Sequence, residues 1–218
     1  MRFRPATRED STQLAEFIYL ADLAHYDSSG YEFSIGGTRQ HLRQELAKLA
    51  AAPAASQFHY SHFDIAETPE GTLAAAVASF DKASAGEHAL TALEQVGWTP
   101  DRIQALANRL APLSGIFPEE VPLSWTIEHV ATLPQFRGQG LIRRLLELAL
   151  ERGAQLGFKQ AAVDVFKGND RALGIYQAAG FRPVTTFGDK PLRALFNRDP
   201  LMRLVRPLTD LTSPHGSR

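Results

Sequence analysis

The sequence predicts one α/β domain, in which a mixed sheet is covered by helices on both faces. Two features of element order support this: a pair of strands joined by a tight turn comes early, and a strand–helix–strand–helix–strand series follows. The third observation is composition, because 218 residues with 44% hydrophobic and 22% charged residues are ordinary for a globular protein. At about 150 residues per domain, the length suits one embellished domain that can bury a core without disulfides or metals.

The first elements are a short strand and two helices. Residues Met1–Arg4 are typical of a strand, and Asp10 or Ser11 can cap the helix that follows. A loop, His25–Gly37, leads to a second helix over Thr38–Ala51. The apolar residues of the first helix recur at helical spacing: Leu14, Phe17, Ile18, Ala21 and Ala24.

A hairpin and an insertion follow. The strands His62–Glu67 and Thr72–Phe80 are joined by a Thr-Pro-Glu-Gly turn. The segment Ser84–Leu123 reads as helices interrupted at Pro112 and Pro118. Its apolar residues are too few for a core of its own, so we expect it to pack on the main domain.

The second half alternates strands and helices and then closes with two strands. Asn169 can cap the second helix of this half, and Gly180 can end it. We expect a domain over residues 1–207 and a frayed tail over 208–218. The predicted elements are, in order, strand Trp125–Leu133, helix Gly138–Leu156, strand Ala161–Phe166, helix 169–180, and strands Arg182–Phe187 and Pro200–Pro207.

Charge and cysteine content exclude several function classes. The formal net charge is −1, which argues against a nucleic-acid partner, and the absence of cysteine excludes cysteine nucleophiles and cysteine zinc sites. No metal is expected, since His59 and His62 are three apart in an expected strand and would face opposite sides. Without an apolar signal core or an apolar run of about 18 residues, we expect a cytoplasmic protein without a membrane partner.

The turn between the first strand and helix of the second half, Gln135–Gly140, has the features of an anion site. The first N–H groups of a helix lack internal partners and carry the positive end of the helix dipole. No Ser, Thr, Asp or Asn stands immediately before the helix to occupy them, and Gly138 and Gly140 allow a ligand close to the backbone. Arg137 can add charge-assisted contacts to a phosphate. Taken alone, the two glycines also fit a tight structural turn.

The same stretch resembles the Gln/Arg-x-x-Gly-x-Gly/Ala signature of the GNAT superfamily of N-acetyltransferases. The start of the chain, Arg4–Asp10, is similar to the family's common start, and Leu201–Leu204 is similar to its last strand. The clear similarity covers 124–181, and the insertion lies outside the pattern. Past the helix, further residues have the family's usual spacing: Val165, Asn169, Ala172, Tyr176, Gly180 and Phe181.

The resemblance implies a largely antiparallel mixed sheet with a splayed parallel pair, here Trp125–Leu133 and Ala161–Phe166. It also implies acetyl-CoA as cosubstrate, with pantetheine in the splay and the pyrophosphate on backbone N–H groups after the first of these strands. Because the chain has no cysteine that could form an acyl-enzyme, the sequence fits direct transfer of the acetyl group from the thioester to the acceptor. The implied cofactor-binding residues are Val130, Ala131, Thr132, Leu133, Gln135, Phe136, Arg137, Gly138, Gln139, Gly140, Leu141, Asn169 and Tyr176.

The acceptor amine must lose a proton before it can attack. The family's commonest glutamate position falls on Thr126, which cannot ionise. Strand alternation places Glu128 on the same face, together with Val130, and places His129 on the other. We expect Glu128 to be the base, with Asp164 and His129 as competitors, or with water as an intermediary.

By resemblance, Tyr176 is the tyrosine that protonates or positions the departing thiolate. A tyrosine on this amphipathic helix can also be simply half-buried, and Asn169 is sufficiently explained as a cap. The aromatic and acidic loop within His25–Phe33 is in the region where the family binds acceptors, although it also fits an ordinary surface loop.

The leading hypothesis is an N-acetyltransferase that moves an acetyl group from acetyl-CoA to a small-molecule or peptide amine in a ternary complex. The loop composition suits a cationic, partly apolar amine. The alternative is a non-catalytic acyl-CoA-binding regulatory module on the same fold. A homodimer is common in the family, but no residue of this sequence demonstrates one.

Overall fold

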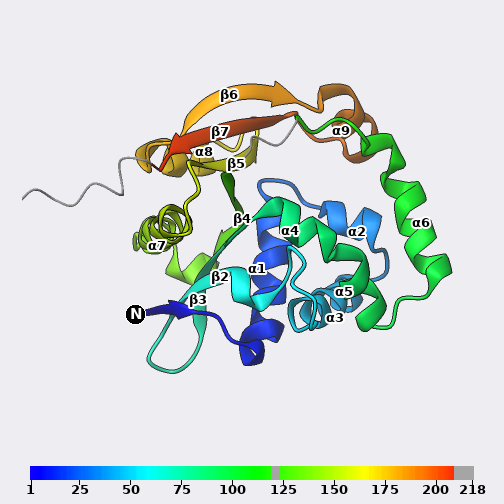
Figure 1. Ribbon diagram of the computed structural model, residues 1–218, viewed down its shortest axis with the longest axis horizontal. Coiled ribbons are helices and arrows are strands. Elements are labelled where there is room, and N and C mark those ends of the chain that lie inside the picture. The colour runs from blue at the N-terminus through cyan, green and yellow to red at the C-terminus, as the bar shows by residue number, and fades with distance from the viewer. Residues whose placement is uncertain (119–122, 209–218) are drawn as a thin grey trace, which may run out of the picture.

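A mixed sheet crosses the computed structural model, which describes residues 1–118 and 123–208 (Figure 1). Within these residues seven strands form one sheet in the order β1-β2-β3-β4-β5-β7-β6. Only β4 and β5 run parallel, and every other neighbouring pair is antiparallel. The strands are β1 (Arg2–Pro5), β2 (Phe63–Glu67), β3 (Leu73–Phe80), β4 (Ser124–Thr132), β5 (Gln160–Phe166), β6 (Arg182–Phe187) and β7 (Leu201–Pro207).

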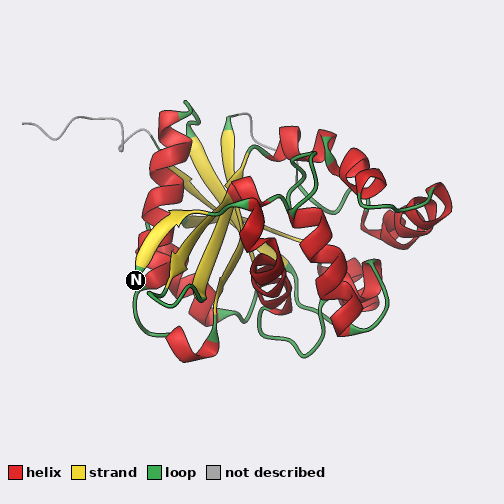
Figure 2. Cartoon of the chain, turned by 90° about the horizontal axis from the view of Figure 1, so that it is seen from below, coloured by secondary structure: helices red, strands yellow, loops and turns green. Residues whose placement is uncertain are grey.

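Helices cover both faces of this sheet, as Figure 2 shows, so the predicted fold class is confirmed. One core contains α1 (Ser11–Leu23) and α3 (Arg39–Ala50) packed on the side chains of one face. The other contains α7 (Leu141–Gln155) and α8 (Asp170–Ala178) on the opposite face. The remaining helices are α2 (Gly30–Ser34), α4 (Lys82–Glu87), α5 (Ala89–Gln95), α6 (Pro100–Leu110) and α9 (Asp189–Phe196).

Most predicted elements are present, within a few residues of the expected ends. Two short helices, α2 and α9, were not predicted. Leu156, the last residue of the predicted helix, is exposed, and α7 ends one residue before it. In the described part of the chain, every helix is too short or too polar to cross a bilayer. The expected tail lies outside the described residues, apart from Leu208.

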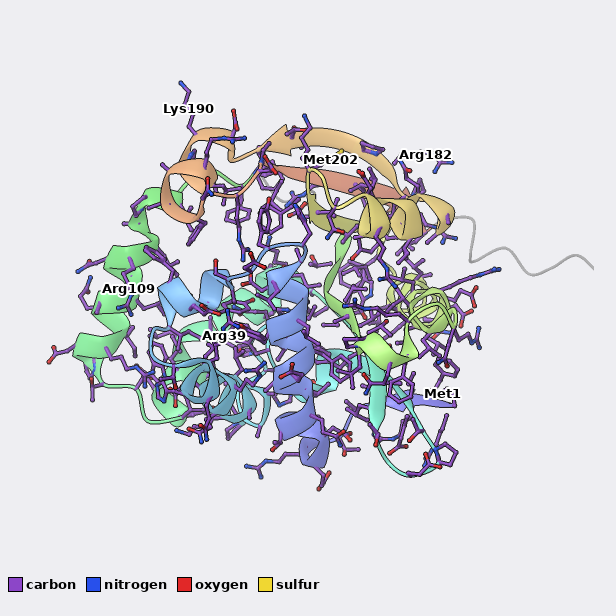
Figure 3. The ribbon with its side chains drawn as sticks, turned by 180° about the vertical axis from the view of Figure 1, so that it is seen from behind. Met1, Arg39, Arg109, Arg182, Lys190 and Met202 are labelled. Atoms are coloured by element: carbon purple, nitrogen blue, oxygen red, sulfur yellow. The ribbon has the colours of Figure 1, made fainter. Side chains whose placement is uncertain are left out.

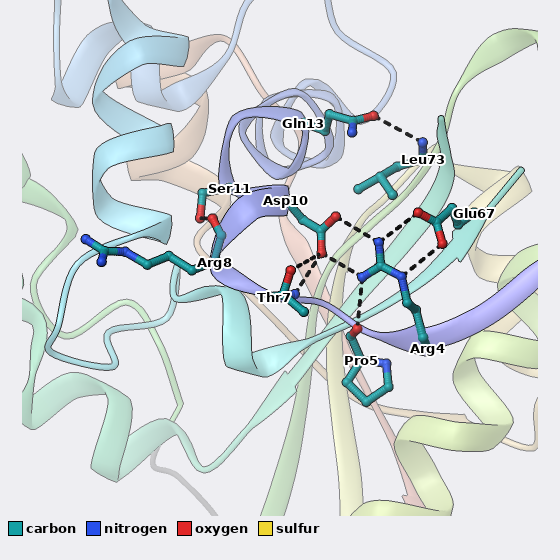
Figure 4. Close-up of polar contacts among 9 residues, drawn as sticks. All are labelled: Arg4, Pro5, Thr7, Arg8, Asp10, Ser11, Gln13, Glu67 and Leu73. Carbon is teal, nitrogen blue, oxygen red and sulfur yellow. Dashed lines mark hydrogen bonds and ion pairs between the residues drawn. The ribbon is translucent and has the colours of Figure 1, made fainter. Parts of the chain in front are cut away.

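Arg4 ties the first strand to both its neighbour and the start of α1 (Figure 4). Its guanidinium donates to both oxygens of Asp10, at 2.7 and 3.0 Å, and to both oxygens of Glu67, at 3.0 and 2.9 Å. Asp10 also accepts from the backbone N–H of Thr7 at 2.7 Å. Asp10 therefore holds the turn before α1. The prediction that its side chain caps this helix is wrong, because the Asp10 side chain accepts no hydrogen bond from the first turn of α1.

One buried carboxylate of the domain holds the inserted helices in place. Glu45 of α3 accepts a hydrogen bond from Trp98 Nε1 at 2.6 Å and pairs with Arg102 at 2.9 Å. Arg102 also lies over the Trp98 ring, 3.6 Å from its centre. The helix that follows, α6, lies at the outer edge of the molecule, where Arg109 is labelled in Figure 3. This segment is therefore anchored where α5 passes into α6.

Candidate active site

The parallel strands β4 and β5 separate halfway along their length. Their register runs from Ser124 opposite Gln160 to Ile127 opposite Val163 and then ends. Beyond it, β4 stays paired with β3 and β5 stays paired with β7. The backbone edge of β4 that faces β5 is therefore unpaired after Ile127, as expected for a splayed pair.

Hydrogen bonding shows which groups line that edge. The N–H of Leu133, just after β4, donates to Ala74 O of the β2–β3 side at 2.9 Å. Because backbone groups alternate along a strand, those of Thr132 and Val130 point the other way, toward β5. The splay therefore presents the polar backbone groups of two residues in the segment predicted to hold pantetheine.

A β-bulge interrupts β4 at His129. Ala78 is opposite Glu128 and Ala76 is opposite Ala131, so two residues of β4 face one residue of β3. His129 has a φ of +49°, in the left-handed region. The bulge therefore adds one residue to the alternation of the strand.

This extra residue corrects the predicted faces of β4. His129 stacks against Phe58 and Phe63 in the α1–α3 core, whereas Val130 packs in the α7–α8 core. His129 Nε2 lies 3.8 Å from Glu128 Oε2. The expectation that Glu128 shares a face with Val130 and is separated from His129 is wrong, because it assumed an uninterrupted period of two.

A cavity of about 740 Å³ lies at the start of α7, between this helix, α8 and the end of β7. It contains seven of the predicted cofactor-binding residues: Thr132, Phe136, Arg137, Gly138, Gln139, Gly140 and Leu141. Residues not predicted also line it: Ile142, Arg143, Leu146, Glu147, Leu150, Arg171, Ile175, Ala178, Ala179, Gly180, Arg206 and Pro207. The sequence carried one signal for these, since Arg143, Glu147 and Leu150 recur at helical spacing after the glycine turn.

The predicted anion cradle forms one wall of this cavity. Gly138 and Gly140 have φ values of +79° and +72°, which only glycine adopts without strain, and a Cβ at either would meet open space. No side chain caps α7. Among the described residues, the N–H groups of Gly138, Gln139, Gly140 and Leu141 have no hydrogen-bond acceptor. These donors are directed to a ligand or to solvent.

The charged side chains around the cavity are mostly positive. Arg137, Arg143, Arg171 and Arg206 line it, against the single acid Glu147. Hydrogen bonds from Arg144, and then from Arg143, hold the pKa of Glu147 below its usual range, so it stays ionised. The remaining positive charge and the helix dipole favour a polyanion.

The other predicted cofactor-binding residues do not line the cavity with their side chains. Ala131 and Leu133 pack in the α1–α3 core. Asn169 caps α8, accepting from Ala172 N at 3.2 Å, as predicted. For Val130, Ala131, Leu133, Gln135, Asn169 and Tyr176 the structure gives no cavity contact.

The three predicted candidates for the base lie around the point where β4 and β5 separate. Glu128 and Asp164 line the same small cavity of about 10 Å³. Asp164 accepts from Arg203 with both oxygens at 2.9 Å, which occupies it as an ion-pair partner. The Glu128 side chain is 34% exposed, so a substrate can reach it. Exposure therefore favours Glu128 over Asp164, whose side chain is 22% exposed.

Tyr176 is buried on α8 and packs edge-on to Phe181, with ring centres 6.0 Å apart. Burial raises the pKa of its hydroxyl well above the usual value, so the group stays protonated at neutral pH. Its neighbours Ile175 and Ala178 line the large cavity. Tyr176 is therefore a buried, protonated hydroxyl on α8, next in sequence to a residue that lines the cavity.

The histidines do not suggest a metal site. His59 caps a short 3₁₀ turn and His62 is its last residue, so neither lies in a strand, and their ring centres are 6.0 Å apart. The expectation that they face opposite sides of a strand is wrong. In the regions the structure covers, no group of three His, Cys, Asp or Glu residues is arranged to hold a metal ion.

The sequence of residues 109–181 matches the Acetyltransferase (GNAT) family. A search of curated protein sequences gave no significant match. Among solved structures, an N-acetyltransferase from Staphylococcus aureus Mu50 has a TM-score of 0.72 at 18% identity, with 94% of this chain and 100% of that chain covered.

Two further structures are similar over nearly their full lengths. A variant of spermidine N-acetyltransferase from Vibrio cholerae has a TM-score of 0.57 at 12% identity, with 98% of each chain covered. A chain from a crystal structure of the NatC complex bound to Gag peptide and CoA has a TM-score of 0.55 at 15% identity, covering 95% of this chain and 98% of that one. At such identities the likeness establishes the shared fold.

Proposed function

We propose that this chain, a member of the GNAT superfamily of acetyltransferases, transfers an acetyl group from acetyl-CoA directly to an amine. The observation that carries the proposal is the cavity of about 740 Å³ beside the splay, with its unpaired N–H groups and four arginines. A coenzyme with a pyrophosphate and a further phosphate suits this charge.

The residues present fit that coenzyme. The N–H groups of Gly138, Gln139, Gly140 and Leu141 would hold the pyrophosphate, and the arginines around the cavity would pair with phosphate oxygens. The backbone of Val130 and Thr132 would pair with pantetheine along the unpaired edge of β4. When bound, acetyl-CoA supplies the acetyl thioester.

The side chains at the splay then supply the proton transfers. Glu128 accepts a proton from the acceptor ammonium, either directly or through a water molecule, and leaves a neutral amine that can form the new C–N bond. Tyr176 gives its hydroxyl proton to the departing CoA sulfur, which takes the electron pair of the broken C–S bond. The acetylated nitrogen then releases its second proton, which restores the Tyr176 hydroxyl, so the products are free CoA and the amide. The chain has no cysteine for an acyl-enzyme, which suits direct transfer in a ternary complex.

We place the acceptor between the α1–α2 loop and the α9–β7 loop, on the other side of the splay from the cavity. Tyr31 of α2 lies close enough to Glu128 for that charge to contribute to the raised pKa of its hydroxyl, after burial and Asp22. Phe33 is partly exposed and packs edge-on to Phe196 of α9, with ring centres 5.1 Å apart. Aromatic surface beside carboxylates suits a cationic, partly apolar amine.

The test combines ligand binding with turnover. Thermal unfolding is measured with acetyl-CoA, with pantetheine, which lacks the pyrophosphate, and with NAD. CoA release is then measured with a panel of polyamines, aromatic amines, peptides with free N-termini and lysine peptides. We expect a rise in Tm with acetyl-CoA well above that with pantetheine, and turnover on at least one amine.

Two outcomes contradict the proposal in different ways. Stabilisation by acetyl-CoA without turnover on any amine would make the chain a binding module. Stabilisation by NAD but not by acetyl-CoA would overturn the cofactor assignment itself.

A further inference from the structure

The ring of His129 is an unusual group in the α1–α3 core. It is 8% exposed, and its Nε2 has no hydrogen-bond partner among the described residues. Buried polar atoms are nearly always hydrogen-bonded, so an unpartnered one calls for an explanation. The backbone at this residue is also in the left-handed region, with a φ of +49°. Such strain persists where the surrounding structure requires it, often at active sites.

The surroundings of the ring fix its orientation. It stacks against Phe58 and Phe63, with ring centres 5.6 and 5.9 Å apart and interplanar angles of 25° and 12°. The bulge and these two rings together aim Nε2 at the carboxylate of Glu128, whose Oε2 lies 3.8 Å away. That separation is longer than a hydrogen bond, but catalytic hydrogen bonds are often long before substrate binds.

The ionisation of the ring matters to its role. Burial, with a further contribution from His62, lowers the pKa of His129 to about 3. The imidazole is therefore neutral in the working pH range and cannot form a full ion pair with Glu128. A neutral imidazole can still donate one hydrogen bond, from whichever nitrogen carries the proton.

We propose that His129 is a positioning residue: its neutral imidazole donates a hydrogen bond from Nε2 to the Glu128 carboxylate as the acceptor binds. This inference rests on the proposed role of Glu128 as the base. The bond fixes the orientation of the Glu128 carboxylate relative to the acceptor ammonium. It also favours the ionised carboxylate, which keeps the base ready at lower pH. The bulge is then a catalytic requirement, because a regular strand would place His129 on the opposite face.

Other titratable and charged side chains lie near His129 and Glu128, and all of them are unchanged in the His129 variants. His62 approaches the imidazole from the turn before β2, and Tyr31 approaches Glu128 from α2. Lys82, Asp164 and Arg203 line the small cavity beside Glu128. None is altered in the experiment, so a change in pH dependence is attributable to residue 129.

The first readout does not depend on turnover. Ring ¹⁵N shifts of His129 are measured in the wild-type chain with acetyl-CoA, from about pH 5 to about pH 9. We expect a neutral ring throughout, with the proton on Nε2. A proton on Nδ1, or titration near the ordinary histidine value, would overturn the proposal.

The second readout is the pH dependence of kcat with the fastest amine of the panel. His129→Phe keeps an aromatic ring but removes the donor, and His129→Asn keeps an N–H donor and tolerates a positive φ. We expect His129→Phe to move the acid limb of kcat upward by about one pH unit, with an unchanged KM for acetyl-CoA, and His129→Asn to restore part of that shift. Equal profiles for wild type and a folded His129→Phe would overturn the proposal.

Glu128→Gln distinguishes the role of the base from that of its positioning residue. Full activity of Glu128→Gln would overturn the base assignment. Inactive Glu128→Gln together with an unshifted His129→Phe would leave the base in place and overturn the role of His129 alone. If His129→Phe does not fold, the ¹⁵N result decides.

Discussion

Trp98 of the inserted segment donates a hydrogen bond to Glu45 of α3 over 2.6 Å, and this buried contact joins two parts of the chain that are 53 residues apart. Lys48 and Arg102 pair with the same carboxylate, at 2.8 and 2.9 Å. Burial alone would raise the pKa of Glu45, but its hydrogen bonds to Lys48 and Trp98 and the charge of Arg102 hold it below the usual value.

Glu45→Gln should therefore destabilise the fold by about 1–3 kcal/mol, because charge-assisted hydrogen bonds are lost in a buried place. Since the folded pKa is lowered, the contribution of Glu45 is present above the unfolded pKa and is lost as pH falls through the folded value. The loss in Glu45→Gln, measured by urea unfolding, should thus be largest near neutral pH and shrink in acid. Glu94→Gln, at an exposed position of the same insertion, serves as control. Equal stability of the two variants at neutral pH would contradict the role of this anchor.

Arg143→Ala should raise the Kd of acetyl-CoA about tenfold, because this arginine lines the cavity and supplies a charge-assisted contact to phosphate. Arg144→Ala is a matched control, since Arg144 also pairs with Glu147 but does not line the cavity. Calorimetric titration with acetyl-CoA at low and high salt measures both. The effect of Arg143→Ala should diminish as salt rises, and equal affinities of the two variants would contradict the assignment.

Gly140→Ala should cost stability and also weaken binding of acetyl-CoA. Its φ of +72° costs an alanine about 1–2 kcal/mol, and the new methyl would project into open space beside the N–H cradle. Gly71→Ala, in the β2–β3 turn at a φ of +83°, carries a similar strain far from the cavity. Both variants should lose similar Tm, and only Gly140→Ala should raise the KM of acetyl-CoA. A similar rise in the KM of acetyl-CoA in Gly71→Ala would show that the effect comes from the general loss of stability.

Glu128→Gln should lower kcat by about 10²- to 10⁴-fold, because the acceptor then keeps its proton. Asp164→Asn should instead leave kcat largely intact and mainly lower stability, because it weakens a bidentate ion pair with the buried Arg203. Steady-state kinetics and thermal unfolding of the two variants separate a base from an ion-pair partner. If Asp164→Asn were the inactive but stable one, the roles would be reversed.

Tyr176→Phe should lower kcat about tenfold or more, with little change in the Kd of acetyl-CoA, since only a proton donor is removed. Because burial raises the pKa of Tyr176, its hydroxyl stays protonated across the assay range. The wild-type kcat should therefore show no alkaline fall up to about pH 10 from this group. Tyr60→Phe, on the short turn before β2, is the control. Unchanged turnover and affinity in Tyr176→Phe would reduce Tyr176 to a packing residue.

The sequence was most informative where local chemistry determines structure. Strand β3 follows from the turn cluster before it, helix α7 follows from apolar residues at helical spacing, and the cradle at Gly138 and Gly140 follows from glycines standing where a cap would be expected. The bulge could not be predicted, because a period of two has no place for an extra residue. The short helix α9 begins after Gly188, which lies close to Leu192 and to Ile116, a residue distant in sequence, so the sequence alone carries no local signal for it. The bidentate pairing of Asp164 with Arg203 also required the three-dimensional structure.

The separation of β4 and β5 also divides the sheet into two halves. One half contains β1 to β4 and the other contains β5, β7 and β6, and the ladder between the halves is only the four register pairs from Ser124–Gln160 to Ile127–Val163. At the open end, the buried Arg198 reaches across from the second half, donates to the carbonyl of Ser28 and lies 3.6 Å from Asp22.

The two halves of the sheet are thus connected at both ends of the gap between β4 and β5, by the ladder at one end and by Arg198 at the other. Connected in this way, the gap has its width set before any ligand binds, so little conformational entropy remains to be lost on binding. The amides of Val130 and Thr132 mark the inner surface of the gap. They are the positions where slowed hydrogen exchange would record its filling.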